Sequence, residues 1–144
     1  MKKLISITLL ATLLFSCGGK TENKPTETVM QEQEQINMAD ASVIKVYYFH
    51  GKQRCKTCIA IENVTKNTIA DSYNDNPKVK FVEIDIDEDK NKEIVEKYEI
   101  AFSSLLIAKG EDYTDLTEQA FANAVNSPDA LTSLIKEEVN KCID

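Results

Sequence analysis

The sequence predicts an α/β fold with a mixed β-sheet flanked by helices. Segments rich in β-branched and aromatic residues alternate with segments whose apolar residues recur at helical spacing, in the order β-α-β-α-β-β-α-α over residues 41–144. Two short strand–helix–strand connections indicate parallel β-α-β units. A Lys-Gly turn between the last two strands indicates a terminal antiparallel hairpin.

The first strand and the first helix meet at a pair of cysteines. Ser42–Phe49 is β-branched or aromatic nearly throughout, which is typical of a strand buried on both faces. Helical spacing begins at Cys58 and ends at the turn sequence Asn-Asp-Asn-Pro, residues 74–77. Glu62 falls mostly outside the apolar stripe of this helix. That stripe consists of Cys58, Ile61, Val64, Thr68 and Ile69.

The second strand and the second helix are short. Lys78–Ile86 alternates between apolar and polar residues, which predicts a strand. Asp89–Ile100 predicts a charged helix with Ile94, Val95 and Tyr98 facing the core. This helix completes the second of the two expected crossovers.

The C-terminal part of the chain contains the hairpin and two helices. Ser103–Ala108 is the third predicted strand, and a turn at Lys109-Gly110 leads into the fourth. One helix is expected near Thr117–Val125. The last helix opens with Ser127-Pro128, a capping residue followed by proline at the first helical position. Its apolar stripe leads to a cysteine and comprises Leu131, Leu134, Ile135, Val139 and Cys142.

Residues 1–16 have the organisation of an export signal. Two lysines precede an apolar stretch at residues 4–15, which is too short to span a bilayer, since about 20 residues are needed. The sequence Leu-Phe-Ser-Cys ending at Cys17 resembles a bacterial lipobox, which implies cleavage before Cys17 and lipidation of that cysteine. The alternative is an ordinary cleaved signal followed by a cysteine. The lipoprotein interpretation predicts an exported bacterial protein, anchored to a membrane and facing the periplasm or the cell exterior.

Composition argues against several classes of partner. Residues 17–40 are rich in Glu, Gln, Thr and Lys, so we expect a flexible tether there. Removing residues 1–16 changes the formal net charge from −7 to −9, because that segment carries two lysines and no acid. Such a charge disfavours binding to nucleic acid or to an anionic membrane surface, which leaves the lipid as the anchor. Residues 41–144 suffice for one small domain, expected to be a monomer.

The position of Cys55-Lys-Thr-Cys58 at a strand-to-helix junction, within this element order, resembles the thioredoxin fold. The resemblance covers residues 42–144 and also rests on "VEIDID", on "KYEI" leading into "LLIAKGE", and on the last helix. The stretch "YYFHGKQRCKTCIAIE" further resembles a small exported thioredoxin-like family, described as nitroreductase-associated subunits and found beside arsenic-resistance genes. The resemblance implies a redox-active disulfide, a protein thiol or disulfide as partner, and no bound cofactor.

The surroundings of the cysteine pair favour thiol chemistry at Cys55. At the start of a helix, its sulfur is expected to face free backbone N–H groups and the positive end of the helix dipole. Lys52, Arg54 and Lys56 add three positive charges, which favour a thiolate or attract an anionic partner. The alternative for these basic residues is a solubilising loop. Cys55 is therefore the expected nucleophile, and Cys58 the buried thiol that resolves a mixed disulfide.

The sequence departs from thioredoxins around this pair. Arg54 stands where they carry tryptophan, and Lys-Thr replaces Gly-Pro between the cysteines, so no reduction potential can be carried over. Ser104 aligns with their cis-proline, and we expect a trans peptide there because a cis bond without proline costs about 3 kcal/mol. Loss of that proline removes a barrier beside the sulfurs and favours metal binding slightly. Phe49 falls near the position of their buried acid.

His50 and Cys142 each have a functional and a structural interpretation. His50, the only histidine, could shuttle protons for Cys58 or ligate a metal. The structural interpretation is a histidine at the end of a strand, hydrogen-bonded to the backbone. Cys142 could be a third redox thiol or a ligand, but a buried and unreactive thiol is the favoured interpretation.

Two functions are consistent with these residues. The first is a membrane-anchored exported thiol–disulfide oxidoreductase that exchanges electrons with a protein partner through Cys55 and Cys58. The family resemblance would place it in a reductive or arsenic-detoxification system. The second is a carrier that binds a soft metal or arsenite on Cys55 and Cys58, helped by His50 or Cys142. An inert disulfide is disfavoured, because a loop closed over four residues restrains the unfolded chain little.

Overall fold

A computed structural model of the protein describes residues 41–144. The expected signal at residues 1–16, the lipidated Cys17 and the tether at residues 17–40 lie outside the described residues. No helix within the described part is long and apolar enough to cross a membrane. The elements are β1 (Ile44–His50), α1 (Lys56–Tyr73), β2 (Val79–Asp85), the 3-10 turn η1 (Asp89–Asn91), α2 (Lys92–Lys97), β3 (Ser104–Lys109), β4 (Asp112–Asp115), α3 (Thr117–Asn123) and α4 (Pro128–Ile143), which confirms the predicted order.

The described strands form one mixed sheet in the order β2-β1-β3-β4. β1 pairs in parallel with β2, so the first predicted β-α-β unit is confirmed. β3 and β4 form the predicted antiparallel hairpin. The second predicted parallel unit is wrong, because β3 runs antiparallel to β1.

Helix length explains why only the first connection is a parallel crossover. Such a connection has to carry the chain back along the full length of a strand, which is about 23 Å for the seven residues of β2. The 18 residues of α1 span about 27 Å and are long enough. The six residues of α2 span only about 9 Å. β3 therefore begins at the end of the sheet where β2 finished and runs in the opposite direction.

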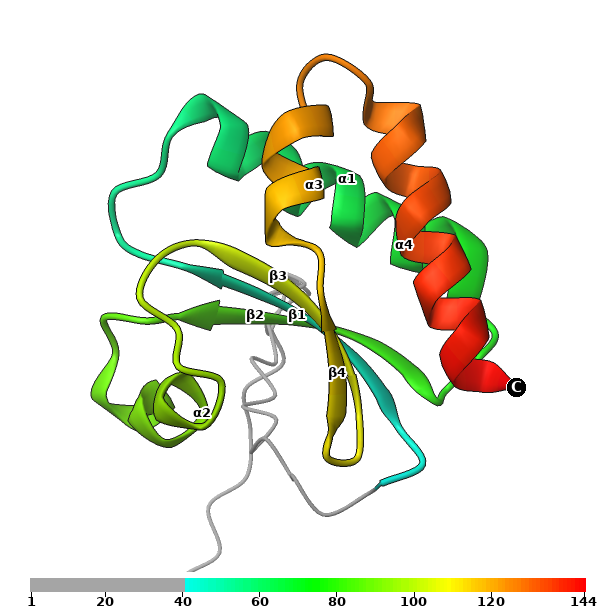
Figure 1. The fold of residues 1–144 in the computed structure, drawn as a ribbon, viewed down its shortest axis with the longest axis horizontal. Coiled ribbons are helices and arrows are strands. Elements are labelled where there is room, and N and C mark those ends of the chain that lie inside the picture. Colours follow the sequence, from blue (N-terminus) through cyan, green and yellow to red (C-terminus); the bar gives the residue numbers. More distant parts are fainter. Residues whose placement is uncertain (1–40) are drawn as a thin grey trace, which may run out of the picture. The chain divides into compact units, whose positions relative to one another are not determined.

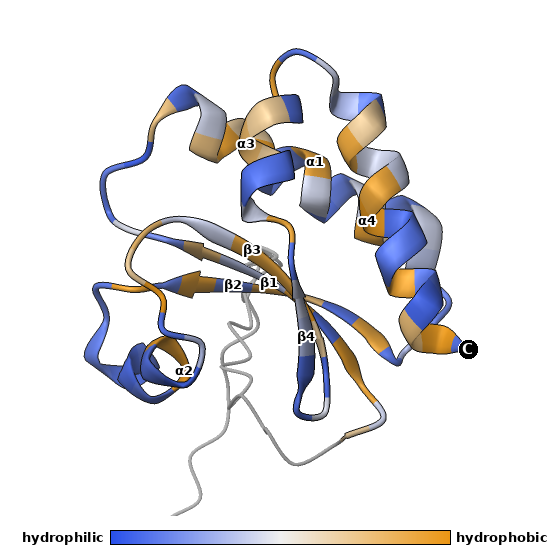
Figure 2. Ribbon diagram, viewed as in Figure 1, coloured by the Kyte–Doolittle hydropathy of each residue, from blue (hydrophilic) through white to orange (hydrophobic). Residues whose placement is uncertain are grey.

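The sheet is covered on both faces (Figure 1). α1, α3 and α4 lie on one face and α2 lies on the other. Side chains alternate along β1, so Val46 and Tyr48 enter the larger core under α1, whereas Tyr47 and Phe49 enter the smaller core under α2. Figure 2 shows hydrophobic residues concentrated along β3 and hydrophilic residues along β4. The expectation of a first strand buried on both faces is confirmed.

α4 packs against α1 and is linked to its last residue by hydrogen bonds. Pro128 is its first residue and Ser127 occupies the N-cap position as predicted, although the Ser127 hydroxyl makes no capping hydrogen bond to the described residues. The Tyr73 hydroxyl, at the end of α1, lies 2.9 Å from Asn140 Oδ1 and 3.2 Å from the carbonyl oxygen of Lys136. The side chains of α4 that are buried against this core are Leu131, Ile135 and Val139.

Candidate functional site

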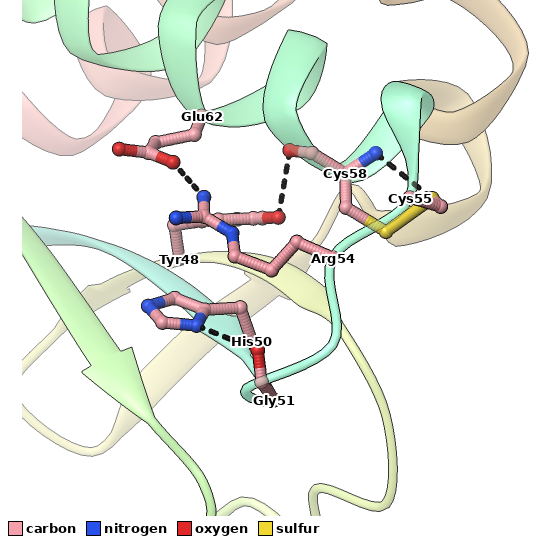
Figure 3. The surroundings of a disulfide bond; sticks show 7 residues. All are labelled: Tyr48, His50, Gly51, Arg54, Cys55, Cys58 and Glu62. Carbon is pink, nitrogen blue, oxygen red and sulfur yellow. Dashed lines mark hydrogen bonds and ion pairs between the residues drawn. A yellow bond between two sulfur atoms is a disulfide. The ribbon is translucent and has the colours of Figure 1, made fainter.

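Cys55 and Cys58 form a disulfide at the junction of β1 and α1 (Figure 3). Their Cα atoms are 5.1 Å apart, within the range that a disulfide requires. Cys55 is exposed to solvent, whereas the Cys58 side chain is buried under the first turn of α1. The predicted division between an accessible and a buried sulfur is confirmed.

The sulfur of Cys55 also caps the N-terminus of α1. Cys55 is the N-cap residue, and its Sγ accepts a hydrogen bond from the backbone N–H of Cys58 at 3.1 Å. The first turn of α1 contains no acidic residue. A thiolate at Cys55 would therefore face the positive end of the helix without a competing carboxylate in that turn, which is the setting that favours thiolate formation.

Tyr48 lies beneath the disulfide. Its side chain points from β1 toward α1, and its hydroxyl donates a hydrogen bond of 2.7 Å to the carbonyl oxygen of Cys58. Burial raises the pKa of Tyr48, and hydrogen bonds with Arg54 and Ser103 partly offset this rise. The phenol therefore stays protonated at neutral pH and acts as the donor that fixes the first turn of α1 to the sheet.

Phe49 does not face the disulfide. It belongs to the smaller core under α2, where its ring centroid lies 5.7 Å from that of Tyr47 and 6.2 Å from that of Tyr98. The sequence placed Phe49 near the position of the buried acid of thioredoxins. In the structure Tyr48 occupies the position that faces the pair, because the two residues point to opposite faces of the sheet.

The guanidinium of Arg54 is directed at carboxylates. Its Nη2 forms an ion pair with Glu62 Oε2 from α1, and its Nη1 lies 3.6 Å from Glu83 Oε1 from β2. Its Cζ lies 5.7 Å from the centre of the Tyr48 ring. Figure 3 shows the side chain running away from the two sulfurs toward Glu62. The two carboxylates thus compensate the charge of Arg54 in the disulfide form. From the sequence, we expected Arg54 to favour a thiolate at Cys55 and did not include these carboxylates.

His50 has oxygen atoms next to both ring nitrogens. Its Nδ1 lies 3.1 Å from the carbonyl oxygen of Gly51, and its Nε2 lies 2.9 Å from Glu83 Oε1. The side chain is largely buried. The backbone contact agrees with the structural interpretation, and the contact with Glu83 was not anticipated. Neither nitrogen is left over for a sulfur or a metal in this arrangement.

Of the remaining predicted site residues, Lys52 and Lys56 flank Cys55, whereas Ser104 points to the other face of the sheet. Lys52 and Lys56 are exposed on either side of Cys55, and the backbone N–H of Lys52 donates to Asp87 Oδ2 at 2.9 Å. Ser104 is buried at the start of β3, on the face occupied by Leu106, and its hydroxyl donates to the carbonyl oxygen of Phe102 at 2.9 Å. The adjacent Ser103, and not Ser104, reaches the Tyr48 hydroxyl.

Cys142 lies at the opposite end of the sheet. Lys109 Nζ donates to the carbonyl oxygen of Cys142 at 2.6 Å, and Lys109 pairs with Ile44 at the start of β1. Cys55 follows the end of that strand, about 20 Å away along β1. Cys142 therefore cannot share a site with Cys55 and Cys58 in this structure. Among residues 41–144, no group of three or more His, Cys, Asp or Glu side chains is placed to hold a metal ion, and a disulfide couple needs no cofactor.

Besides Tyr48 and Ser103, sequence reasoning missed two acidic residues and one aromatic residue of this site. Glu62 follows Cys58 by four residues, so helical spacing alone could have placed it on the same face of α1. Glu83 has the same parity as Val79 in β2, which directs it toward α1. Phe102 is 63% exposed directly before Ser103, and nothing in the sequence distinguishes it from a core residue.

Comparison with known proteins gives no family for this chain. No protein family matches it, and neither does any curated protein. Among solved structures, the chain is similar to one described as "Structure of a malarial protein", with a TM-score of 0.46 and 18% identity, covering 66% of this chain and 96% of that chain. This level of similarity carries no functional argument.

Proposed function

We propose that the protein is a thiol–disulfide oxidoreductase with a thioredoxin-like fold. The observation that carries the proposal is the Cys55–Cys58 disulfide, in which an exposed sulfur at the start of α1 is bonded to a buried sulfur one turn further on. An accessible sulfur can be attacked by, or attack, a partner. A buried sulfur linked to it can close the cycle without contact with the partner.

The reaction consists of two exchanges. In the reduced protein, the Cys55 thiolate attacks a disulfide of the partner, which forms a mixed disulfide and releases one partner thiolate. The Cys58 thiol then loses its proton to solvent and attacks Cys55 Sγ, which forms the Cys55–Cys58 bond and releases the second partner thiolate. Two electrons pass to the partner and the two released thiolates take up protons. The same steps in reverse oxidise a partner dithiol.

The architecture supports a thioredoxin-like fold. The disulfide stands between a central strand and the helix that follows it, in a sheet of order β2-β1-β3-β4 with an antiparallel hairpin at one edge. Helices lie on both faces (Figure 1). The Cys55-Lys-Thr-Cys58 motif at this strand-to-helix junction also supports a thioredoxin-like fold.

The rim of the disulfide suits a protein partner. Ile59 directly follows Cys58 and is 45% exposed, and Phe102 is 63% exposed next to the Ser103 that reaches Tyr48. Lys52 and Lys56 are exposed beside Cys55. Apolar side chains that flank an exposed sulfur, with cations around them, favour contact with an apolar segment that carries acidic residues.

Export and anchoring form part of the same proposal. The signal-like residues 1–16 and the lipobox-like sequence at Cys17 support a lipoprotein on the periplasmic or outer side of a membrane. An oxidising compartment would keep the pair available as a disulfide. The family resemblance adds the proposal that the partner belongs to a reductive or arsenic-detoxification system.

Glutathione exchange tests the proposal. The Cys58→Ser variant of the full-length chain, reduced and then treated with glutathione disulfide, is expected to keep glutathione on Cys55, because no resolving thiol remains. The reduced wild type is expected to release it and close the Cys55–Cys58 bond. Mass spectrometry of the Cys55 peptide reads both species.

The Cys55→Ser variant is the matched control. It should acquire glutathione far more slowly, because Cys58 is buried. If the wild-type dithiol fails to close to a disulfide at every glutathione ratio, the oxidoreductase proposal is wrong.

A further inference from the structure

Arg54, the residue before the reactive cysteine, carries a largely buried cation. Its side chain is only 23% exposed, and its peptide bond joins it directly to Cys55. Charges that are partly removed from water interact more strongly than exposed ones. Lys52 and Lys56 are exposed, so solvent screens their charges more effectively.

Glu62 is the carboxylate dedicated to this cation. Its side chain is 14% exposed, and it forms an ion pair with Arg54. Glu83 is more exposed, at 37%, and it is shared between Arg54 and His50. Figure 3 shows Glu62 on the far side of the Arg54 guanidinium from the two sulfurs. The Arg54 guanidinium thus lies between Glu62 and the sulfurs.

The charge at this position affects only one redox state. Reduction by a thiol buffer converts the Cys55–Cys58 disulfide and two glutathione molecules into the protein dithiol and one glutathione disulfide. The dithiol can carry a thiolate at Cys55, whereas the disulfide carries no charge. A positive charge nearby therefore stabilises the reduced state and makes the couple more oxidising, and a negative charge has the opposite effect.

We propose that Glu62 sets the reduction potential of the Cys55–Cys58 couple by neutralising Arg54, which keeps the couple more reducing than its cluster of basic residues would make it. The inference rests on the proposed function, because it concerns the same disulfide. Glu62 and Arg54 are positioning residues in this account, since neither exchanges electrons or protons with the partner.

Two single substitutions are expected to act in opposite directions. Glu62→Gln leaves Arg54 less compensated, so the equilibrium constant for reduction by glutathione should rise about fivefold. That change corresponds to a potential about 21 mV more oxidising. Arg54→Gln leaves Glu62 uncompensated, so the same constant should fall about fivefold. Arg54→Lys keeps the charge and should stay within about twofold of the wild type.

The matched control is Asp71→Asn. Asp71 is exposed on the same helix, and its substitution changes the net charge by the same amount as Glu62→Gln. The potentials of the full-length proteins are measured in glutathione buffers, and circular dichroism verifies that each variant is folded. Asp71→Asn should match the wild type within about twofold.

The outcomes separate the two proposals. If Glu62→Gln and Asp71→Asn give the same potential, the tuning role of Glu62 is wrong, while the oxidoreductase proposal stands. If Glu62→Gln and Arg54→Gln move the potential in the same direction, the pair is structural and the inference is again wrong. If the wild type forms no reversible disulfide, the proposed function itself fails.

Discussion

At the scale of single residues, the Tyr48 hydroxyl links the sheet to the reactive turn. It donates to the Cys58 carbonyl at 2.7 Å from a fully buried position. That carbonyl belongs to the first turn of α1, so the bond holds the turn whose N–H groups face Cys55. Tyr48 thus connects the hydrophobic core to the chemistry of the pair.

The Tyr48→Phe variant removes this donor and the hydroxyl's interactions with Arg54 and Ser103. We expect the free energy of unfolding of the oxidised protein to fall by about 1–3 kcal/mol, because the Cys58 carbonyl loses its buried partner. Urea denaturation followed by circular dichroism measures the change. Tyr113→Phe is the control, since Tyr113 is 52% exposed, and it should change the free energy by less than about 0.5 kcal/mol. Equal effects of the two substitutions would contradict this role of Tyr48.

Cys142 is a second residue whose surroundings predict its behaviour. Burial raises the pKa of its thiol, and the Lys109 charge only partly offsets this effect. A raised pKa means less thiolate at neutral pH, so alkylation of Cys142 by iodoacetamide should be slower in the folded than in the unfolded protein. Peptide mass spectrometry reads the rate. Alkylation of Cys142 in the folded protein as fast as in urea would refute the expectation.

At the scale of secondary structure, hydrophobic periodicity predicted where elements lie but not which way each strand runs. β1, β2 and β3 occur close to their predicted ranges, because buried strands and amphipathic helices have different repeats. The direction of β3 depends on whether the preceding helix can span the sheet. This depends on the length of α2 relative to the length of β2, so the hydrophobic pattern of a single element cannot reveal it.

The candidate site likewise has features that the sequence predicted and one that it did not. The exposure of Cys55 and the burial of Cys58 follow from their spacing on one helix, so the sequence predicted them. The Arg54–Glu62 ion pair depends on where a long side chain turns after it leaves the loop. The sequence places Arg54 beside Cys55 equally well whether its charge faces the sulfur or a carboxylate.

α4 offers a test of element packing. Ile135→Ala should lower the free energy of unfolding by about 2–5 kcal/mol, because Ile135 is fully buried in the larger core between α4 and the sheet. Ile143→Ala, in the last turn of the same helix, should have a small effect, since Ile143 is 44% exposed. Urea denaturation compares them. A cost for Ile143→Ala that equals the cost for Ile135→Ala would show that α4 does not pack as described.

At the scale of the whole molecule, buried phenols make stability depend on alkaline pH. Burial raises the pKa of Tyr47, Tyr48, Tyr73 and Tyr98 above the value of 10.0 of a free tyrosine. Above that pH the unfolded chain loses these protons before the folded chain does. The folded state then binds more protons, so its stability falls as pH rises from about 10.

This prediction can be checked by urea denaturation between pH 8 and pH 11. The oxidised Cys142→Ala protein should be used, so that Cys142 cannot attack the disulfide. The free energy of unfolding should fall with pH, and it should fall less steeply after Tyr47→Phe. Unchanged stability from pH 8 to pH 11 would show that the phenols are as accessible in the folded state as in the unfolded one.

The two edges of the sheet have a further consequence. β4 has four exposed residues, Asp-Tyr-Thr-Asp, and β2 carries Lys80 and Glu83 along the other edge. Short or charged edge strands resist the addition of strands from other molecules. Lipid anchoring, as proposed, would confine many copies to two dimensions and raise their frequency of collision. Because such edges do not accept further strands, the crowded molecules would stay separate and would not polymerise through their sheets.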